Sequence, residues 1–321
     1  MTEKKKRILI TGHQGLLGSE IIKRLKKNKY KNIFFISKNK LDLRDSNRVL
    51  SYFKKMKFDY VYSCAAKVGG IMANVRYPQH FLCNNLEITL NIAKACYETK
   101  VRKMLFIGSS CIYPQKTKQP IKEEFLLTSS MEKSNESYAI SKIAGIKICE
   151  SYNRQYNTDF RCVMPTNLYG ENDNFDAENS HVIPGLIHKM YTAKIKGKDS
   201  VKLWGTGKPI REFLFAEDMA SSCVKIMSLS KNKIKKFIKP QQSHINIGTG
   251  KGISIKKLSK IISDVVGYEG KILFDKSHPD GHPKKVNDIS LQTKIGIKNN
   301  FDLTKGIEIC FKGYLKYNEI I

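Results

Sequence analysis

Tyr138 and Lys142 place a phenol and an ammonium group four residues apart within the stretch 135–152. If that stretch is a helix, the two side chains lie on one face, and the lysine charge favours the tyrosinate and lowers the pKa of the phenol. Tyr138 is then a candidate proton donor. Because this spacing also occurs by chance on many helices, the interpretation depends on what surrounds the pair.

The segment that must hold a cofactor for such a donor is glycine-rich. Gly12, Gly15 and Gly18 form a G-x-x-G-x-x-G turn between a predicted strand over residues 8–10 and an amphipathic helix over 16–27. The glycines permit a tight turn and close approach of the backbone to a pyrophosphate, while the helix N-terminus offers N–H groups to the anion. A glycine-rich turn without a ligand is the alternative.

A second strand, predicted over residues 33–36, indicates which dinucleotide binds. A free ribose 2′-hydroxyl usually meets an acidic residue at this point, and none is present. Ser37, Lys38 and Lys40 follow the strand instead and suit a 2′-phosphate. The sequence therefore favours NADP(H) over NAD(H).

Strands and helices alternate through the first half of the chain. Further strands are predicted over 60–66, 103–108 and 160–164, with helices over 46–57 and 78–99 and one carrying Tyr138. This alternation predicts an α/β fold with a doubly wound parallel (Rossmann) sheet and ligands at the carboxyl ends of its strands. Gly12, Ala65, Ser109 and Pro165 fall at those ends.

The alternation loosens after residue 170. We predict an NADP-binding Rossmann domain over residues 1–170, with a segment near 211–249 returning to the sheet. Residues 171–210 and 250–321 are predicted to form a smaller C-terminal substrate-binding lobe, with helices over 181–194, 255–266 and from 303 and a strand over 271–274, while a strand over 244–247 belongs to the returning segment.

Composition excludes some classes of protein. The 321 residues are 41% hydrophobic and contain no long apolar run, so no membrane span is predicted, and the basic N-terminal segment leads into a strand rather than a signal segment. The eight cysteines form no C-x-x-C pair or zinc-type cluster, so no metal site is predicted. These features predict a cytoplasmic protein.

The net charge of +28 is mostly lysine: 48 of the 57 basic residues are lysine and nine are arginine. They are spread along the chain, whereas nucleic-acid recognition favours arginine and a localised patch. Nucleic-acid binding is therefore not predicted as the main function, although the positive field should attract anionic substrates.

A strand-end serine upstream of Tyr-x-x-x-Lys, with a glycine-rich first turn, resembles the extended short-chain dehydrogenase/reductases. Several motifs are similar more narrowly to the GDP-L-fucose synthase family, which converts GDP-4-keto-6-deoxy-D-mannose by 3,5-epimerisation and 4-reduction with NADPH. They are KVGGI (67–71), GSSCIYP (108–114), YAISKIAGIK (138–147), PTNLYG (165–170), DNF (173–175), NSHVIP (179–184), WGTG (204–207) and REFL (211–214).

The resemblance implies roles for five residues. Tyr138 would donate a proton to the ketone oxygen as hydride arrives at the carbon, Ser109 would hold that oxygen, and Lys142 would lower the tyrosine pKa and bind the nicotinamide ribose. Epimerisation at C3 and C5 requires a proton to leave one face of each carbon and return on the other. Cys111 and His181 match the family's paired base and acid, although a base role for a cysteine requires a nearby positive charge or helix terminus. A buried core cysteine and a helix-end histidine are the alternatives.

The resemblance also implies binding residues and an assembly. Those for the GDP-linked 4-keto-6-deoxy sugar are Asn167, Lys189, Trp204, Arg211 and Lys285. Those for NADP(H) are Gly12, Gly15, Leu16, Leu17, Gly18, Lys38, Asp42, Leu43, Ala65, Tyr138, Lys142, Pro165, Asn167, Leu168 and His181. A homodimer through the two long helices, 78–99 and the one carrying Tyr138, is expected.

Two positions depart from the family pattern. Glu171 stands where proline is usual, and Gly185 stands where alanine is common, which would enlarge the space beside the helix that follows His181. A 4-keto reductase acting on a GDP-4-keto-6-deoxy-heptose without epimerisation therefore remains an alternative. A more distant one is a non-catalytic NADP- or nucleic-acid-binding module.

Overall fold

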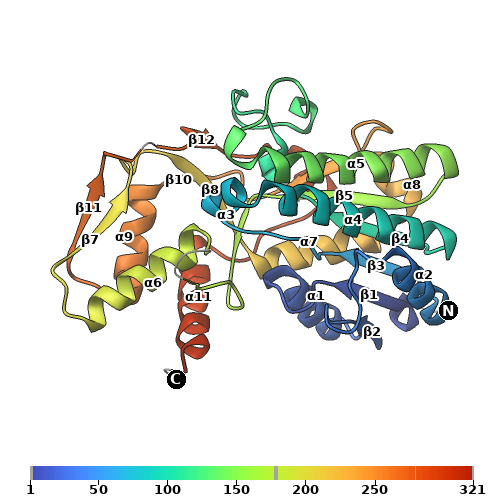
Figure 1. The fold of residues 1–321 in the computed structure, drawn as a ribbon, viewed down its shortest axis with the longest axis horizontal. Helices are drawn as coiled ribbons and strands as arrows, with labels where there is room; N and C mark the ends of the chain where they lie inside the picture. Colours follow the sequence, from blue (N-terminus) through green and yellow to red (C-terminus); the bar gives the residue numbers. More distant parts are fainter. Residues whose placement is uncertain (1–2, 177–179, 279, 320–321) are drawn as a thin grey trace.

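The computed structural model describes residues 3–176, 180–278 and 280–319. Its larger part is a six-stranded parallel sheet in the order β2-β1-β3-β4-β5-β9 (Figure 1). The strands are β1 (Arg7–Thr11), β2 (Asn32–Phe35), β3 (Tyr60–Ser63), β4 (Lys103–Ile107), β5 (Phe160–Pro165) and β9 (His244–Ile247). The predicted doubly wound parallel sheet is confirmed.

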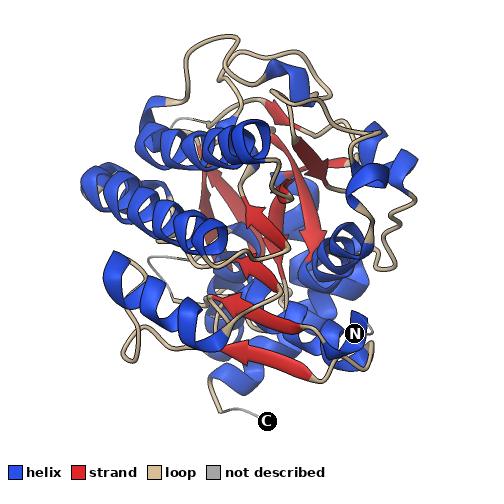
Figure 2. Cartoon of the chain, turned by 90° about the vertical axis from the view of Figure 1, so that its right-hand side faces the viewer, coloured by secondary structure: helices blue, strands red, loops and turns tan. Residues whose placement is uncertain are grey.

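Helices cover both faces of this sheet, as Figure 2 shows from the end of the molecule. One face packs on α2 (Ser46–Met56), α4 (Pro78–Glu98) and α5 (Glu136–Tyr156), and the other on α1 (Leu16–Lys27) and α7 (Ala216–Ser228). Each central strand feeds both cores because successive side chains point to opposite faces: Leu9 packs with the α4 side, and Ile8 and Ile10 with the α1 side.

The second lobe is built around β8 (Ile210–Phe215). This strand pairs in parallel with β6 (Asn167–Tyr169) and β12 (Lys284–Lys285) and antiparallel with β10 (Gly252–Ser254), while β7 (Ser200–Trp204) and β11 (Lys271–Asp275) form a separate parallel pair. A third core lies between these strands and α6 (Val182–Ile195), α9 (Ile255–Val266) and α11 (Leu303–Tyr317).

Several elements differ from the sequence expectations. The third strand was predicted to run to residue 66 but ends at Ser63, because the N–H groups of Cys64 and Ala65 turn to the Thr11 hydroxyl, both at 3.2 Å. Short helices absent from the prediction are α3 (Ile71–Arg76), α8 (Lys231–Ile234) and α10 (Ser290–Ile295). The residue limits proposed for the two domains stay a prediction.

None of the helices in the described ranges combines the length and the apolar character needed to cross a membrane.

Candidate functional site

The glycine turn after β1 has the shape that a dinucleotide requires. Gly12 has φ +66°, and a Cβ there would lie 2.8 Å from the backbone nitrogen of Ala65. A Cβ at Gly18 would lie 2.2 Å from the Gly12 carbonyl oxygen, so helix and turn meet at a distance that only glycine permits. The N-cap of α1, Gly15, supplies no side-chain hydrogen bond, which leaves the first amides of the helix to an anion such as a pyrophosphate. This turn fits NADP(H).

The ribose end of the predicted cofactor site carries charges of both signs. Lys38 is exposed just beyond β2, and Leu43 is partly buried. A hydrogen bond from Arg44 is the main reason that the pKa of Asp42 falls to about 2, and the Lys38 charge lowers it further. Arg44 was not predicted, although an arginine two residues after an aspartate in a tight loop is a recognisable signal of such pairing.

The end of β4 brings the predicted reductive residues together. Ser109 begins the 3-10 turn Ser110–Ile112, and its hydroxyl accepts the Cys111 N–H at 3.2 Å. The helix carrying Tyr138 can approach this turn because Gly145 lies against the ring of Phe106, where a Cβ would be 2.2 Å from the ring edge. A hydrogen bond with Ser109 acts on the Tyr138 phenol, so the two hydroxyls meet.

The electrostatics of this cluster differ from one expectation. Burial is the main reason that the pKa of Tyr138 is raised, and the Cys111 charge adds to it, whereas Lys142 was expected to lower it. The physical reason is the position of the ammonium: Lys142 Nζ donates to the Ile107 carbonyl at 2.9 Å and lies 5.7 Å from the Tyr138 ring centroid. Burial lowers the pKa of Lys142 to about 8.

Cys111 links the reductive residues to the predicted substrate cations. It lies close enough to Tyr138 on one side and to Arg211 on the other to contribute to the pKa of both. Arg211 donates to the His282 carbonyl at 2.5 Å, and burial lowers its pKa. Lys285 forms an ion pair with Glu132 at 3.0 Å, and Arg211 also lowers the pKa of Glu132. Ser109, Cys111, Tyr138, Arg211 and Lys285 therefore converge.

His181 approaches from the second lobe. It is the N-cap residue of α6, half of its side chain is exposed, and its Nδ1 lies 3.7 Å from the Asp173 carboxylate. Ser180, the preceding residue, lies against the N-cap of α3: its carbonyl would be 3.9 Å from a Cβ at Gly70. The Ser180 hydroxyl also fills the space beside Gly185, where a Cβ would approach it to 2.8 Å, so that glycine makes room for a protein side chain rather than opening a cavity.

The remaining predicted residues are divided between the two lobes. Asn167 and Leu168 lie on β6 beside the end of β5 at Pro165, and the Asn167 amide donates to the Glu212 carbonyl at 2.7 Å. Leu16 and Leu17 begin α1. Lys189 and Trp204 have their contacts within the second lobe: Lys189 donates to the Lys202 carbonyl at 2.6 Å, and the exposed Trp204 stacks on His278 with ring centroids 4.7 Å apart.

Sequence reasoning missed two acidic residues in this region, Glu132 and Asp173. Glu132 pairs with a lysine 153 positions further along the chain, a contact that no local pattern reveals. Asp173 is the first residue of the DNF motif (173–175), and its short spacing to His181 could have predicted that the two side chains pair.

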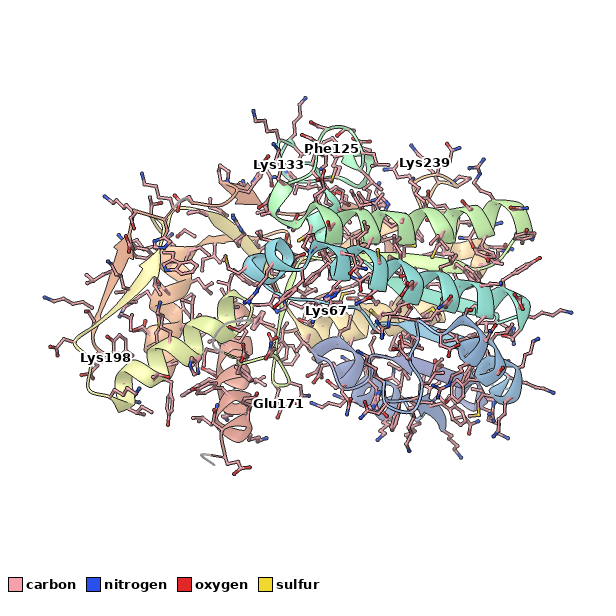
Figure 3. The ribbon with its side chains drawn as sticks, in the orientation of Figure 1. Lys67, Phe125, Lys133, Glu171, Lys198 and Lys239 are labelled. Atoms are coloured by element: carbon pink, nitrogen blue, oxygen red, sulfur yellow. The ribbon has the colours of Figure 1, made fainter. Side chains whose placement is uncertain are left out.

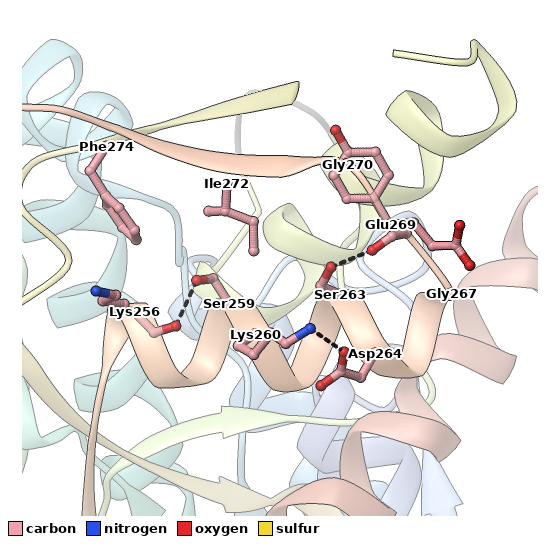
Figure 4. A pocket seen from close by; sticks show the side chains of 11 residues that line it. Lys256, Ser259, Lys260, Ser263, Asp264, Gly267, Glu269, Gly270, Ile272 and Phe274 are labelled. Atoms are coloured by element: carbon pink, nitrogen blue, oxygen red, sulfur yellow. Dashed lines mark hydrogen bonds and ion pairs between the residues drawn. The ribbon is translucent and has the colours of Figure 1, made fainter. Parts of the chain in front are cut away.

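A cavity of about 640 Å³ lies elsewhere, between α9 and β11. Its lining includes Lys260 paired with Asp264 at 2.8 Å and Ser263 bonded to the Tyr268 carbonyl (Figure 4). It contains none of the predicted site residues. Within the described ranges, no group of three or more His, Cys, Asp or Glu side chains is placed to hold a metal ion.

A parallel sheet with a glycine-rich first turn and a Ser-Tyr-Lys set at its carboxyl edge defines a dinucleotide-dependent enzyme of the extended short-chain dehydrogenase/reductase type. The profile of the NAD-dependent epimerase/dehydratase family matches residues 8–248, and the chain belongs to this family. It is 44% identical to the GDP-L-fucose synthase of Escherichia coli strain K12 over 97% of each chain. The predicted resemblance is therefore confirmed.

Two solved structures are also similar. One is a GDP-6-OMe-4-keto-L-xylo-heptose reductase from C. jejuni, 32% identical, with a TM-score of 0.92 over 99% of both chains. The other is MlghC, a GDP-mannoheptose C4 reductase from Campylobacter jejuni with NADP bound, 31% identical, with a TM-score of 0.88 over 98% of this chain and 99% of that one.

Proposed function

We propose that this protein is an NADP(H)-dependent epimerase/reductase that converts GDP-4-keto-6-deoxy-D-mannose to GDP-L-fucose, by 3,5-epimerisation followed by 4-keto reduction. The observation that carries the proposal is the position of Cys111. It lies on the same turn as Ser109, close enough to Tyr138 and to Arg211 to contribute to the pKa of both. A reductase site therefore has a candidate base beside its proton donor.

For the reduction, bound NADPH supplies hydride to C4 of the sugar. Negative charge then develops on the ketone oxygen, which needs a proton donor and a fixed hydrogen bond. Tyr138 donates its phenolic proton to that oxygen, and the Ser109 hydroxyl holds it. The Lys142 ammonium, which donates to the Ile107 carbonyl at the end of β4, would bind the nicotinamide ribose.

For the epimerisation, the same two hydroxyls stabilise the enolate that forms when a carbon beside the ketone loses its proton. The Cys111 thiolate takes the proton from one face, and protonated His181 returns one to the opposite face. The sequence of steps is repeated at the second carbon, after both groups have exchanged protons with water. No proton is gained or lost overall.

For the nucleotide, Arg211 and Lys285 offer positive charge to the diphosphate beside the reacting sugar. Glu132 pairs with Lys285 at 3.0 Å, so a diphosphate would compete with this carboxylate for the ammonium. Lys189 adds positive charge further along, and the exposed face of Trp204 suits a planar base. Asn167 completes the proposed set of substrate-binding residues.

The rival function is 4-reduction of a GDP-4-keto-6-deoxy-heptose without epimerisation, and the likeness to two heptose reductases favours it. Incubation with NADPH and each keto sugar, followed by NMR of the product, separates the two. Inversion at C3 and C5 with reduction at C4 of the hexose supports our proposal. Change at C4 alone supports the rival, and no consumption of NADPH with either sugar supports the non-catalytic module.

We also propose a cytoplasmic homodimer. Leu90 on α4 and Ile140 on α5 are 49% and 43% exposed, and the two helices lie side by side on one outer face (Figure 1). Pairing of this face between two copies would cover those side chains. All eight cysteines are free, as expected in a reducing compartment. Analytical ultracentrifugation of the protein and of Leu90→Glu tests the dimer.

A further inference from the structure

Asp173 is a buried acid that faces the one predicted catalytic residue of the second lobe. Its side chain is 3% exposed, and its Oδ1 lies 3.7 Å from the Nδ1 of His181. That oxygen also accepts the Asn174 N–H at 2.8 Å, whereas Oδ2 is buried with no hydrogen-bond partner among the described residues. A carboxylate this deeply buried needs a charge partner, and the imidazole is the one at hand.

The loop that carries Asp173 is fixed by packing against α11. Gly313 admits the backbone of the loop, because a Cβ there would lie 2.1 Å from the Glu171 carbonyl oxygen. The ring of Phe175 packs edge-on against Tyr314, with centroids 5.3 Å apart. Cys310 on α11 also faces Asp173, but burial raises the pKa of this thiol, so it stays neutral. Of these two described partners of the carboxylate, only His181 can become positive.

We propose that Asp173 is a positioning residue: it accepts Nδ1–H of His181, holds the ring in place, and keeps it protonated so that Nε2 can return a proton to the sugar carbon on the face opposite Cys111. This inference rests on the proposed epimerase function. The proton moves from Nε2 to the enolate carbon, the carboxylate stays ionised, and the neutral ring regains its proton from water. In agreement, Asp173 is the main cause that raises the pKa of His181.

The test compares Asp173→Asn, which keeps the shape and removes the charge, with Asp264→Asn on α9 as a matched surface control. Epimerisation is followed as deuterium incorporation at C3 and C5 of GDP-4-keto-6-deoxymannose in D2O. Redox chemistry is followed separately as oxidation of GDP-L-fucose by NADP+, which needs no prior epimerisation. The His181 ring is titrated by NMR, its signal being assigned from its loss in His181→Asn.

In Asp173→Asn we expect a lower His181 pKa, deuterium incorporation slower by about tenfold to a hundredfold, and GDP-L-fucose oxidation within about twofold of the unmodified protein. As pH rises, epimerisation should also be lost at a lower pH in this variant than in the unmodified protein, because His181 with its lower pKa loses its proton sooner. Asp173→Glu should restore part of the rate. An unchanged His181 pKa overturns the proposal, and so does an equal fall in both activities, which would mark a purely structural role.

Failure of the proposed function is distinguishable from failure of this inference. If the unmodified protein incorporates no deuterium at C3 or C5, the epimerase assignment falls. The titration still decides on Asp173 in that case: a lower His181 pKa in Asp173→Asn supports its hold on the ring, and an unchanged one overturns it.

Discussion

The two halves of the proposed chemistry are built differently. The reductive residues belong to one continuous unit, in which Ser109 follows the end of β4 at Ile107 and α5 carries Tyr138 and Lys142 across the same edge of the sheet. Lys142 is 5% exposed and anchored to the Ile107 carbonyl. The proton-transfer residues for epimerisation come from two lobes instead, Cys111 from the sheet edge and His181 from the start of α6.

Because the two sets of residues are held differently, reduction and epimerisation should be separable by mutation. Reduction depends on packing within the Rossmann sheet, which the core on the α4 and α5 side fixes. Epimerisation depends also on how the second lobe presents His181, and therefore on a loop supported by α11. A relative could keep the first and lose the second by changes outside the dinucleotide fold.

Tyr138→Phe should have the largest effect, and it should act mainly on the reduction. Removal of the phenolic proton should lower NADPH oxidation with the keto sugar by about 10²–10⁴-fold. Deuterium exchange at C3 and C5 should fall less, because the enolate loses one of its two hydrogen bonds and keeps that from Ser109. Tyr152→Phe, further along the same helix, is the matched control. Absorbance of NADPH gives the first rate and NMR the second. Retained NADPH turnover would remove Tyr138 from the role of acid.

Cys111→Ser should act mainly on the epimerisation. Serine is a far weaker base, so deuterium incorporation should fall by about a hundredfold or more, while NADP+-dependent oxidation of GDP-L-fucose persists. Cys83→Ser, at a half-buried position on α4, controls for loss of a thiol. If Cys111→Ser leaves both the exchange and the product stereochemistry unchanged, the epimerase claim is wrong.

The pH dependence of reduction tests the reductive half by itself. Burial lowers the pKa of Lys142 to about 8. Because the ammonium is lost as pH rises through that value, kcat/KM for reduction should decline above about pH 8. The folded protein also binds fewer protons than the unfolded chain between pH 8 and the usual lysine value, so its stability should rise with pH across that window.

Lys142→Arg provides the comparison, since a guanidinium keeps its charge throughout this range. The alkaline decline should move to higher pH, with a maximal rate reduced by roughly tenfold because a larger group replaces the buried ammonium. Steady-state rates between pH 6 and 10 measure both. An alkaline decline at the same pH in both proteins would assign it to another group.

Local patterns predicted the long elements well. Helices over 16–27 and 255–266 are observed as α1 and α9 with those limits, because their apolar residues recur at helical spacing and their ends carry clear signals. The six residues of α3 are too few for periodicity to show. β6 and β12 are only three and two residues long and exist through pairing with β8, a contact between distant segments.

The same distinction between local patterns and distant contacts applies to the residues of the candidate site. Gly12, Ser109 and Tyr138 stand in motifs whose spacing carries their chemistry, so the sequence was enough to nominate them. Glu132 and Asp173 act through partners that the fold supplies. The position of the Lys142 ammonium could not be predicted from the sequence. Helical spacing assigns Lys142 to the same face as Tyr138, but its hydrogen bond to the Ile107 carbonyl depends on where β4 ends.

The smallest effect expected is at the junction of the lobes. Glu171, near the middle of the molecule in Figure 3, pairs with Lys23 of α1 at 3.0 Å and with Lys316 of α11 at 3.1 Å. Both lysines are more than half exposed, so each pair contributes about 1 kcal/mol or less. Hydrogen bonding from Lys23 is the main cause that lowers the Glu171 pKa. The stability that these pairs contribute is therefore present above the usual pKa of a glutamate and is lost as pH falls through the lowered pKa of Glu171.

Glu171→Gln should therefore lower the free energy of unfolding at neutral pH by about 1 kcal/mol or less. The difference should shrink at high salt and disappear at acidic pH, where the carboxylate is protonated. Glu308→Gln, whose carboxylate pairs with Lys305 on the same helix α11, is the control. Because the bridge joins the helix behind the cofactor turn to the helix behind Asp173, deuterium exchange should fall more than NADP+-dependent oxidation. Equal changes in both activities would show that the two lobes keep their relative position without the ion pairs of Glu171.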